Sequence, residues 1–211
     1  MHNDIVSCVE RKLIYISDSD GSCIQRCDLT CGIPLLRRIW PISGTPCRPC
    51  GLSITQPDCN LLVTCRGESN KLRELSADNG QCVREIALQS DIIDPWHAVK
   101  LTSGQYVVSH GSRLSNSLHR VCIVDDDGNV TRSYGGHESL DDTLSCPSHL
   151  AVDEDTQFMF VADHVNDKIV GLGPQFAHFF IRGLSGPWRL HLHARRLYVG
   201  QWIDGVTVIH L

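Results

Sequence analysis

The chain has 211 residues, of which 42% are hydrophobic and 20% charged, with a formal net charge of −5. These values are typical of a folded protein and exclude an intrinsically disordered chain. The negative charge argues against nonspecific binding to nucleic acid or acidic lipid, because such proteins usually carry a basic surface. No run of 18 apolar residues is present, so the sequence predicts no membrane span.

The cysteines indicate a compartment. Eleven cysteines, an odd number, are scattered along the chain, and the start MHNDIVSCVERK lacks the pattern of a secretory signal. These features predict a reducing, cytoplasmic setting. A glycosylation sequon at Asn129 to Thr131 points the other way.

A repeat runs through the whole chain. Strand-like runs KLIYISD, NLLVTC, QYVVSH, FMFVAD and RLYVGQ end at residues 18, 65, 110, 163 and 201. Their spacing of roughly 40 to 50 residues is typical of propeller repeats. Four of the runs follow an apolar segment that begins at a proline, and we call Pro49, Pro95, Pro147 and Pro187 the leading prolines. Asp4, in NDIVSC, has the same phase in the first copy.

Each of these runs is followed by a polar turn and a third strand-like segment, and a fourth segment closes the first four copies. The pattern predicts an all-β propeller of about five four-stranded blades, the last one incomplete. The expected blades are 1–45, 46–93, 94–144, 145–184 and 185–211. A β-sandwich is the alternative fold, but a sandwich would not produce five matched copies.

The segment PSHLAVDEDTQFMFVADHVNDKIVGL (147–172) resembles an NHL repeat, the blade of tripartite-motif NHL proteins, and two other copies resemble it more loosely. The sequence pattern also resembles that of NHL-like propellers of invertebrates. This resemblance implies a β-propeller that normally has six blades. Because only about five copies are present, three alternatives remain. The chain is part of a longer protein with a six-bladed ring, or it forms a five-bladed or open ring by itself. In the third alternative, a partner or a second copy of the chain covers the unpaired edge of a blade.

Matched repeat positions converge around a propeller axis. Two residues after the leading prolines stand Gly51, His97, His149 and Arg189, with Asp4 as the equivalent in the first copy. Asp4, His97 and His149 are candidate metal ligands, and related peptidyl-amidating lyases resemble this arrangement of axial histidines. The favoured interpretation is that these side chains hydrogen-bond to backbone and water, so we expect no cofactor.

A second set of matched positions lies where the second strand of each blade ends. The resemblance implies that Asp18 and Asp163 cap the following loops by accepting backbone N–H groups, with Asn70 and Asn166 as loop partners.

Tryptophans mark the expected channel mouth. Trp96 and Trp188 directly follow leading prolines, and Trp202 follows the second-strand residue Gln201. Tryptophan is a frequent anchor of binding surfaces. The candidate ligand-binding residues are therefore Trp96, His97, His149, Trp188, Arg189 and Trp202.

The function that these features predict is binding of a protein or peptide. The resemblance implies the substrate-recognition module of a larger ubiquitin-ligase-like protein. Single-stranded RNA binding is an alternative that the charge of −5 disfavours. A metal-dependent lyase or hydrolase using the axial histidines is a second alternative. No Gly-x-Ser-x-Gly or His-Glu-x-x-His motif is present, so no catalytic residue is assigned.

Five cysteines lie in CIQRCDLTCGIPLLRRIWPISGTPCRPC (23–50), and only Cys47 and Cys50 have the spacing of zinc ligands. The repeat places the segment across the end of one blade and the start of the next, which favours core and loop positions over a zinc site.

Overall fold

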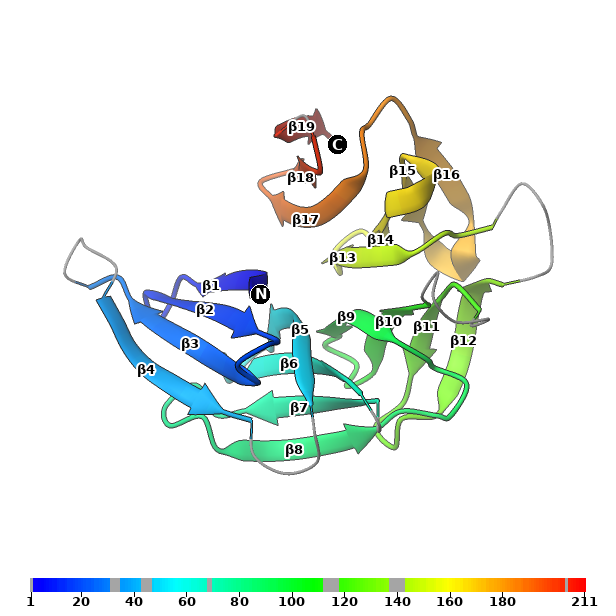
Figure 1. Ribbon diagram of the computed structural model, residues 1–211. Coiled ribbons are helices and arrows are strands. Elements are labelled where there is room, and N and C mark those ends of the chain that lie inside the picture. The colour runs from blue at the N-terminus through cyan, green and yellow to red at the C-terminus, as the bar shows by residue number, and fades with distance from the viewer. Residues whose placement is uncertain are drawn as a thin grey trace.

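A computed structural model describes residues 2–30, 35–42, 47–67, 70–111, 118–136, 143–203 and 205–211. The described residues form five antiparallel sheets arranged around a central axis, which is a five-bladed β-propeller (Figure 1). Within each sheet the strands follow chain order from the axis outward. The prediction of an all-β propeller with an incomplete last blade is confirmed.

Four blades have four strands and the fifth has three. Blades 1 and 2 comprise β1 (His2–Cys8), β2 (Leu13–Asp18), β3 (Cys23–Asp28), β4 (Leu35–Pro41), β5 (Arg48–Ile54), β6 (Leu61–Arg66), β7 (Lys71–Leu75) and β8 (Cys82–Ala87). Blades 3 to 5 comprise β9 (Pro95–Lys100), β10 (Tyr106–His110), β11 (Arg120–Val124), β12 (Val130–Gly135), β13 (Pro147–Asp153), β14 (Phe158–Asp163), β15 (Lys168–Leu172), β16 (His178–Ile181), β17 (Pro187–His193), β18 (Arg196–Gln201) and β19 (Val206–His210).

Two short 3-10 helices interrupt blade 4, His164–Asn166 and Pro174–Phe176. Among the described residues, no helix is long and apolar enough to cross a membrane.

Neighbouring blades pack face to face. Alternating apolar side chains of one sheet meet those of the next, so that each interface is a small hydrophobic core. The four interfaces contain, in order, the buried pairs Tyr15 and Leu61, Leu72 and Tyr106, Val107 and Val161, and Phe160 and Leu197.

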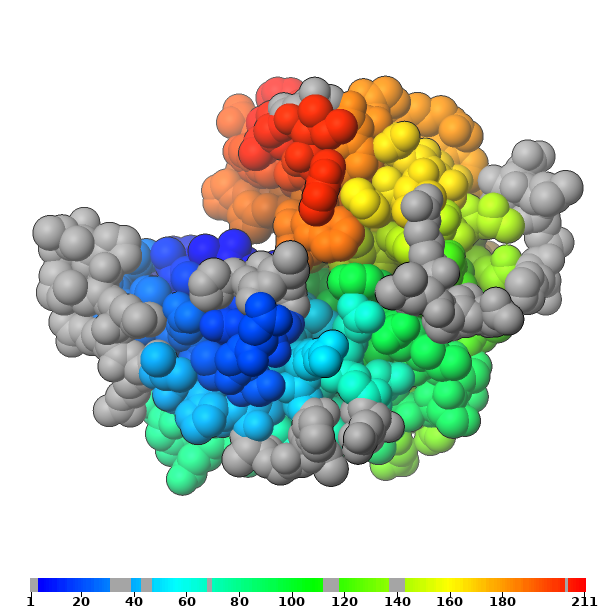
Figure 2. Space-filling view, in the orientation of Figure 1, coloured from blue at the N-terminus to red at the C-terminus, as the bar shows by residue number. Residues whose placement is uncertain are grey.

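No core cluster of the described residues joins blade 5 to blade 1. Ile5 of β1 and Val206 of β19 are 62% and 67% exposed. The surface is hollowed between the blue first blade and the orange and red fifth blade (Figure 2). The ring is therefore open on this side, as one of the alternatives drawn from the sequence proposed.

The innermost strands of blades 2 to 5 each carry a register shift immediately after the leading proline. In blades 3, 4 and 5 the proline and the residue two positions later pair with consecutive residues of the second strand. Trp96, Ser148 and Trp188 are the extra residues of these bulges. A bulge redirects the side chains on either side of it. These bulges set the direction in which the axial residues and the tryptophans project.

The ends of the second strands hold the loops that precede the leading prolines. Asp163 Oδ1 accepts a hydrogen bond from the N–H of Ser145 at 2.6 Å, and Gln201 Oε1 accepts one from the N–H of Ser185 at 2.6 Å. Ser145 and Ser185 both lie two residues before a leading proline. The same pair of repeat positions is therefore joined in both blades.

In blade 2 these two repeat positions are occupied by Cys47 and Cys65, and a disulfide joins them. The covalent bond takes the place of the hydrogen bond seen in blades 4 and 5. Sequence reasoning did not anticipate it, although the repeat alignment contained the signal. Cys50, which has the spacing of a zinc ligand relative to Cys47, is buried and donates to the carbonyl of Pro95 in the next blade, as the expected core position requires.

The expected loop-capping residues have the following partners. Asp18 Oδ1 accepts the N–H of Gly21 in the turn that follows it, at 3.0 Å. Asp163 differs, because the N–H that it accepts belongs to the preceding loop, and it reaches the following turn through the side-chain amide of Asn166 at 2.8 Å. Asn70 and Asn166 each donate to a backbone carbonyl in the loop before a leading proline, those of Ile92 and Thr143.

Gly51 allows the innermost strands of blades 2 and 3 to approach each other. A Cβ at this position would lie 2.7 Å from the Cα of His97, and the obstructing atoms include backbone that cannot rotate away. We expect Gly51→Ala to lower the free energy of unfolding by about 1–3 kcal/mol, the usual cost of overpacking. Urea unfolding measures this change.

Gly200→Ala is the matched control, because a Cβ there meets its nearest atoms at 3.5 Å or more. Equal stability of Gly51→Ala and Gly200→Ala would contradict the close approach of the two strands.

Candidate functional site

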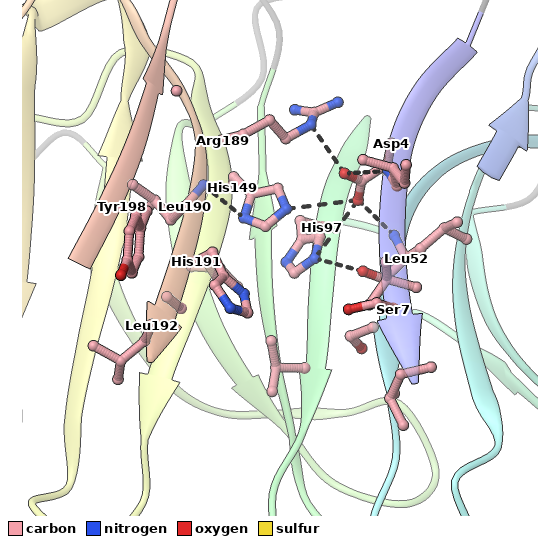
Figure 3. Close-up of a pocket in the computed structure, with 18 of the residues that line it drawn as sticks. Asp4, Ser7, Leu52, His97, His149, Arg189, Leu190, His191, Leu192 and Tyr198 are labelled. Carbon is pink, nitrogen blue, oxygen red and sulfur yellow. Dashed lines mark hydrogen bonds and ion pairs between the residues drawn. The ribbon is translucent and has the colours of Figure 1, made fainter. Parts of the chain in front are cut away.

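Four charged or titratable side chains from four blades meet on the axis. Asp4 comes from β1, His97 from β9, His149 from β13 and Arg189 from β17. Asp4 Oδ1 lies 3.0 Å from Nε of Arg189, and Oδ2 lies 3.6 Å and 3.8 Å from Nε2 of His149 and His97 (Figure 3). The repeat register predicted this convergence, and we call these four residues the axial cluster.

Backbone groups complete the surroundings of Asp4. Its carboxylate accepts the N–H of Ile5 at 3.0 Å and the N–H of Leu52, on blade 2, at 2.8 Å. The register shift between Pro49 and Leu52 in the pairing of β5 with β6 accompanies this contact. Asp4 therefore contacts groups from all five blades.

The partners of the two histidines determine which nitrogen carries the proton. The N–H of Leu190 donates to Nδ1 of His149 at 3.4 Å, so the proton of the His149 ring is on Nε2, which faces Asp4. Nε2 of His97 lies 3.0 Å from the carbonyl oxygen of Leu52, which can only accept, so Nε2 is the protonated nitrogen there too. Both rings thus direct N–H groups toward oxygen atoms. The rings stack with centroids 3.7 Å apart.

Burial and charge shift the titration of this cluster. Burial by itself raises the pKa of Asp4, but His149, Arg189 and His97 together outweigh it and hold the pKa well below its usual range. Burial, reinforced by the neighbouring His149, lowers the pKa of His97 to about 3. At neutral pH, Asp4 is therefore a carboxylate and His97 is an uncharged imidazole.

Ligand atoms of Asp4, His97 and His149 lie within 4.8 Å of one another, which is close enough for a metal site. A metal would need the Nε2 lone pairs. His97 could move its proton to Nδ1, which has no partner among the described residues, but Nδ1 of His149 accepts the N–H of Leu190, so the proton of His149 stays on Nε2. The Arg189 guanidinium, 3.0 Å from the same carboxylate, would also repel a cation. The donor set therefore does not fit a metal, and the favoured interpretation of a hydrogen-bonded polar cluster agrees with this geometry.

A cavity of about 560 Å³ extends from the axial cluster along the centre of the propeller and is lined by the innermost strands of all five blades. Its walls are mainly apolar and include Val99, Val152 and Leu192, while His191 and Tyr198 line the fifth-blade side (Figure 3). Its volume falls in the range of small-molecule pockets.

The predicted tryptophans form a continuous aromatic surface. Trp188 makes edge contacts with Trp96 and Trp202, with ring centroids 5.7 Å and 5.9 Å apart, and the His164 ring lies 4.7 Å from Trp188. Trp202 is 70% exposed and its neighbour Ile203 is 79% exposed. We call these five residues the tryptophan surface. His164 was not predicted, because it stands outside the leading-proline pattern.

The axial cluster and the tryptophan surface are adjacent. Arg189 directly follows Trp188 in β17, and its Cζ lies 5.2 Å from the Trp188 ring centroid. On the other side of the surface, Arg66 stacks on Trp96 with Cζ 4.1 Å from the ring centroid. The candidate ligand-binding residues thus occupy two connected layers, a largely buried polar one and an aromatic one in which Trp96 and Trp188 are half-buried and Trp202 is exposed.

No family model and no curated protein matches the chain. Solved structures do resemble it. A protein of unknown function from Bacteroides caccae has a TM-score of 0.75 and 15% identity over 99% of this chain and 77% of that chain. The nidogen/laminin complex gives a TM-score of 0.75 and 19% identity over 97% and 73%. Catalytically inactive virginiamycin B lyase from Staphylococcus aureus with quinupristin gives 0.66 and 11% over 99% and 69%. At these identities the likeness shows the propeller fold alone.

Asp4→Asn tests the role of the buried carboxylate. The substitution removes the charge that compensates Arg189, and loss of one partner of a buried ion pair costs about 3–5 kcal/mol. We therefore expect a large drop in the free energy of unfolding by urea. A drop below about 1 kcal/mol, the value of an exposed ion pair, would show that Asp4 does not hold the blades together.

The titration of His97 predicts a pH dependence of stability. With a pKa near 3 in the folded state and about 6.5 when unfolded, the unfolded state binds the extra proton between these values. Stability is then fully present above pH 6.5 and falls as the pH drops toward 3. Urea midpoints at pH 7, 6, 5 and 4 should decrease in that order.

In His97→Gln, whose amide can still donate to Leu52, the decrease should be shallower. Parallel curves for the two proteins would contradict the assignment of the proton uptake to His97.

Proposed function

We propose that the chain is a protein- or peptide-binding propeller of NHL type, the partner-recognition module of a larger ubiquitin-ligase-like protein. The observation that carries this proposal is the tryptophan surface at the channel mouth. Its outermost residues, Trp202 and Ile203, are 70% and 79% exposed and adjoin two further tryptophans. Exposed clusters of large apolar side chains are typical of interaction sites.

The position of this surface also supports recognition of a macromolecule. It combines residues of blades 3, 4 and 5, so its shape depends on the assembled propeller rather than on one loop. A propeller of the same fold, in the nidogen/laminin structure, was solved in a complex with another protein. The short NHL-like segment 147–172 gives the proposed family and the proposed ubiquitin-ligase context.

The two alternatives receive less support. The axial cluster directs protonated nitrogens toward Asp4 and Leu52, which disfavours a metal-dependent lyase or hydrolase. The net charge of −5 disfavours RNA binding through phosphate contacts.

Peptides selected from a random library with free C-termini provide ligands for a binding test. We expect Trp202→Ala to weaken the binding of these peptides about 30-fold, because a tryptophan that acts as a binding hot spot contributes about 2 kcal/mol. Isothermal titration calorimetry measures the change. The thermal unfolding midpoint should not change, since Trp202 is 70% exposed.

Val83→Ala is the matched control. Val83 is also an exposed apolar residue, at 59%, but it lies on β8, the outer strand of blade 2. Selection of no peptide, or equal weakening by Trp202→Ala and Val83→Ala, would refute the tryptophan surface as the binding site.

A further inference from the structure

Arg189 has hydrogen-bonding capacity that the fold does not use. Its Nε contacts Asp4 at 3.0 Å and its Nη1 donates to the carbonyl oxygen of Trp188 at 3.1 Å. Within the part of the chain that the structure describes, Nη2 has no hydrogen-bond partner. The Arg189 side chain is 25% exposed. Both Nη atoms lie on the side of the guanidinium away from Asp4 (Figure 3).

The two charged groups of the Asp4–Arg189 ion pair differ in their exposure to solvent. The Asp4 side chain is only 1% exposed, so it is hidden behind Arg189, and the guanidinium is the half of the ion pair that reaches solvent. Arg66, whose side chain is 24% exposed, is paired with Asp94 at 3.1 Å. A protein with an overall charge of −5 thus presents a cation against the half-buried Trp188, whose ring contacts the exposed Trp202.

The free edge of a guanidinium has a specific chemical complement. Nη1 and Nη2 present parallel N–H groups that match the two oxygens of a carboxylate, whereas a neutral carbonyl uses only one of them. The Trp188 ring, 5.2 Å from Cζ, shields one side of this edge from water. Such shielding strengthens a charge-assisted hydrogen bond.

We infer that the tryptophan surface recognises an acidic peptide segment, whose carboxylate binds the Nη1 and Nη2 edge of Arg189 while its apolar side chains contact Trp188 and Trp202. This inference rests on the proposed function and specifies its ligand. The carboxylate belongs either to an aspartate or glutamate side chain or to the C-terminus of the segment.

The decisive experiment changes the ligand and leaves the protein intact. Each peptide selected above is synthesised as the parent, with every aspartate and glutamate replaced by asparagine and glutamine, and with an amidated C-terminus. Calorimetry then measures the affinity of each version for the native chain. We expect one of the two modified versions to lose at least about tenfold, the effect of one charge-assisted hydrogen bond, and the version that loses identifies the source of the carboxylate.

The protein-side test uses Arg189→Lys, which keeps a positive charge near Asp4 but lacks the planar edge. This variant should bind the parent peptide at least about tenfold more weakly and should no longer distinguish it from its neutral version. Arg132→Lys is the matched control, because Arg132 also stacks on an aromatic ring, Phe176 at 4.8 Å, but lies on the outer strand β12.

The outcomes separate the two proposals. Peptides that require Trp202 but bind equally in all three versions would overturn the carboxylate inference and leave the proposed function standing. Selection of no peptide, or of peptides that do not require Trp202, would refute both. If Arg189→Lys does not fold, the peptide series on the native chain still decides.

Discussion

The structure depends on one buried carboxylate. Asp4 receives the N–H groups of Ile5 and Leu52, faces protonated nitrogens of His97 and His149, and pairs with Arg189, so that it touches every blade. Apolar cores hold blades 1 to 5 together in chain order, but none formed by the described residues joins blade 5 to blade 1. The Asp4–Arg189 ion pair is therefore a direct polar link across the open side of the ring. The buried Asp4 carboxylate, 1% exposed, strengthens this link, because charges interact more strongly away from water.

This constraint also shapes the binding face. The Asp4 carboxylate accepts from the N–H groups that point toward the axis, so these groups are not available to a ligand. A ligand can still contact the outer edge of Arg189 and the aromatic side chains around it. Trp96 and Trp188, which immediately precede His97 and Arg189 in the sequence, are the extra residues of the bulges after the leading prolines. Each bulge thus directs one side chain to the axial cluster and the preceding tryptophan to the tryptophan surface. The residues that stabilise the ring and those proposed to bind a ligand therefore lie next to each other on the same strands.

In blades 2, 4 and 5, the loop before the leading proline is bonded to the end of the second strand. Comparing the repeats predicts which residues meet there, but not the kind of bond. Alignment of the copies places Ser145 opposite Asp163 and Ser185 opposite Gln201, and the same alignment places Cys47 opposite Cys65. The positions were predictable from the sequence. The kind of bond was not, since a cysteine pair can be two thiols or a disulfide, and only the distance between them distinguishes these states. Asp163 was expected to cap the loop that follows it, but it accepts the N–H of Ser145 in the preceding loop. Both loops lie close to the end of the second strand, and the sequence does not show which of them the carboxylate contacts.

The sequence by itself determined the propeller, its blades, and the set of residues around the axis, because strand periodicity and matched repeat positions are local properties that every copy repeats. Only the tertiary structure decided what the axial residues do. Whether Asp4, His97 and His149 bind a metal or one another depends on which ring nitrogens face Leu52 and Leu190, and those groups belong to other blades. Tertiary structure likewise joined His164 to the tryptophans and left one edge of Arg189 without a partner among the described residues. Both follow from how neighbouring blades pack and not from any spacing along the chain.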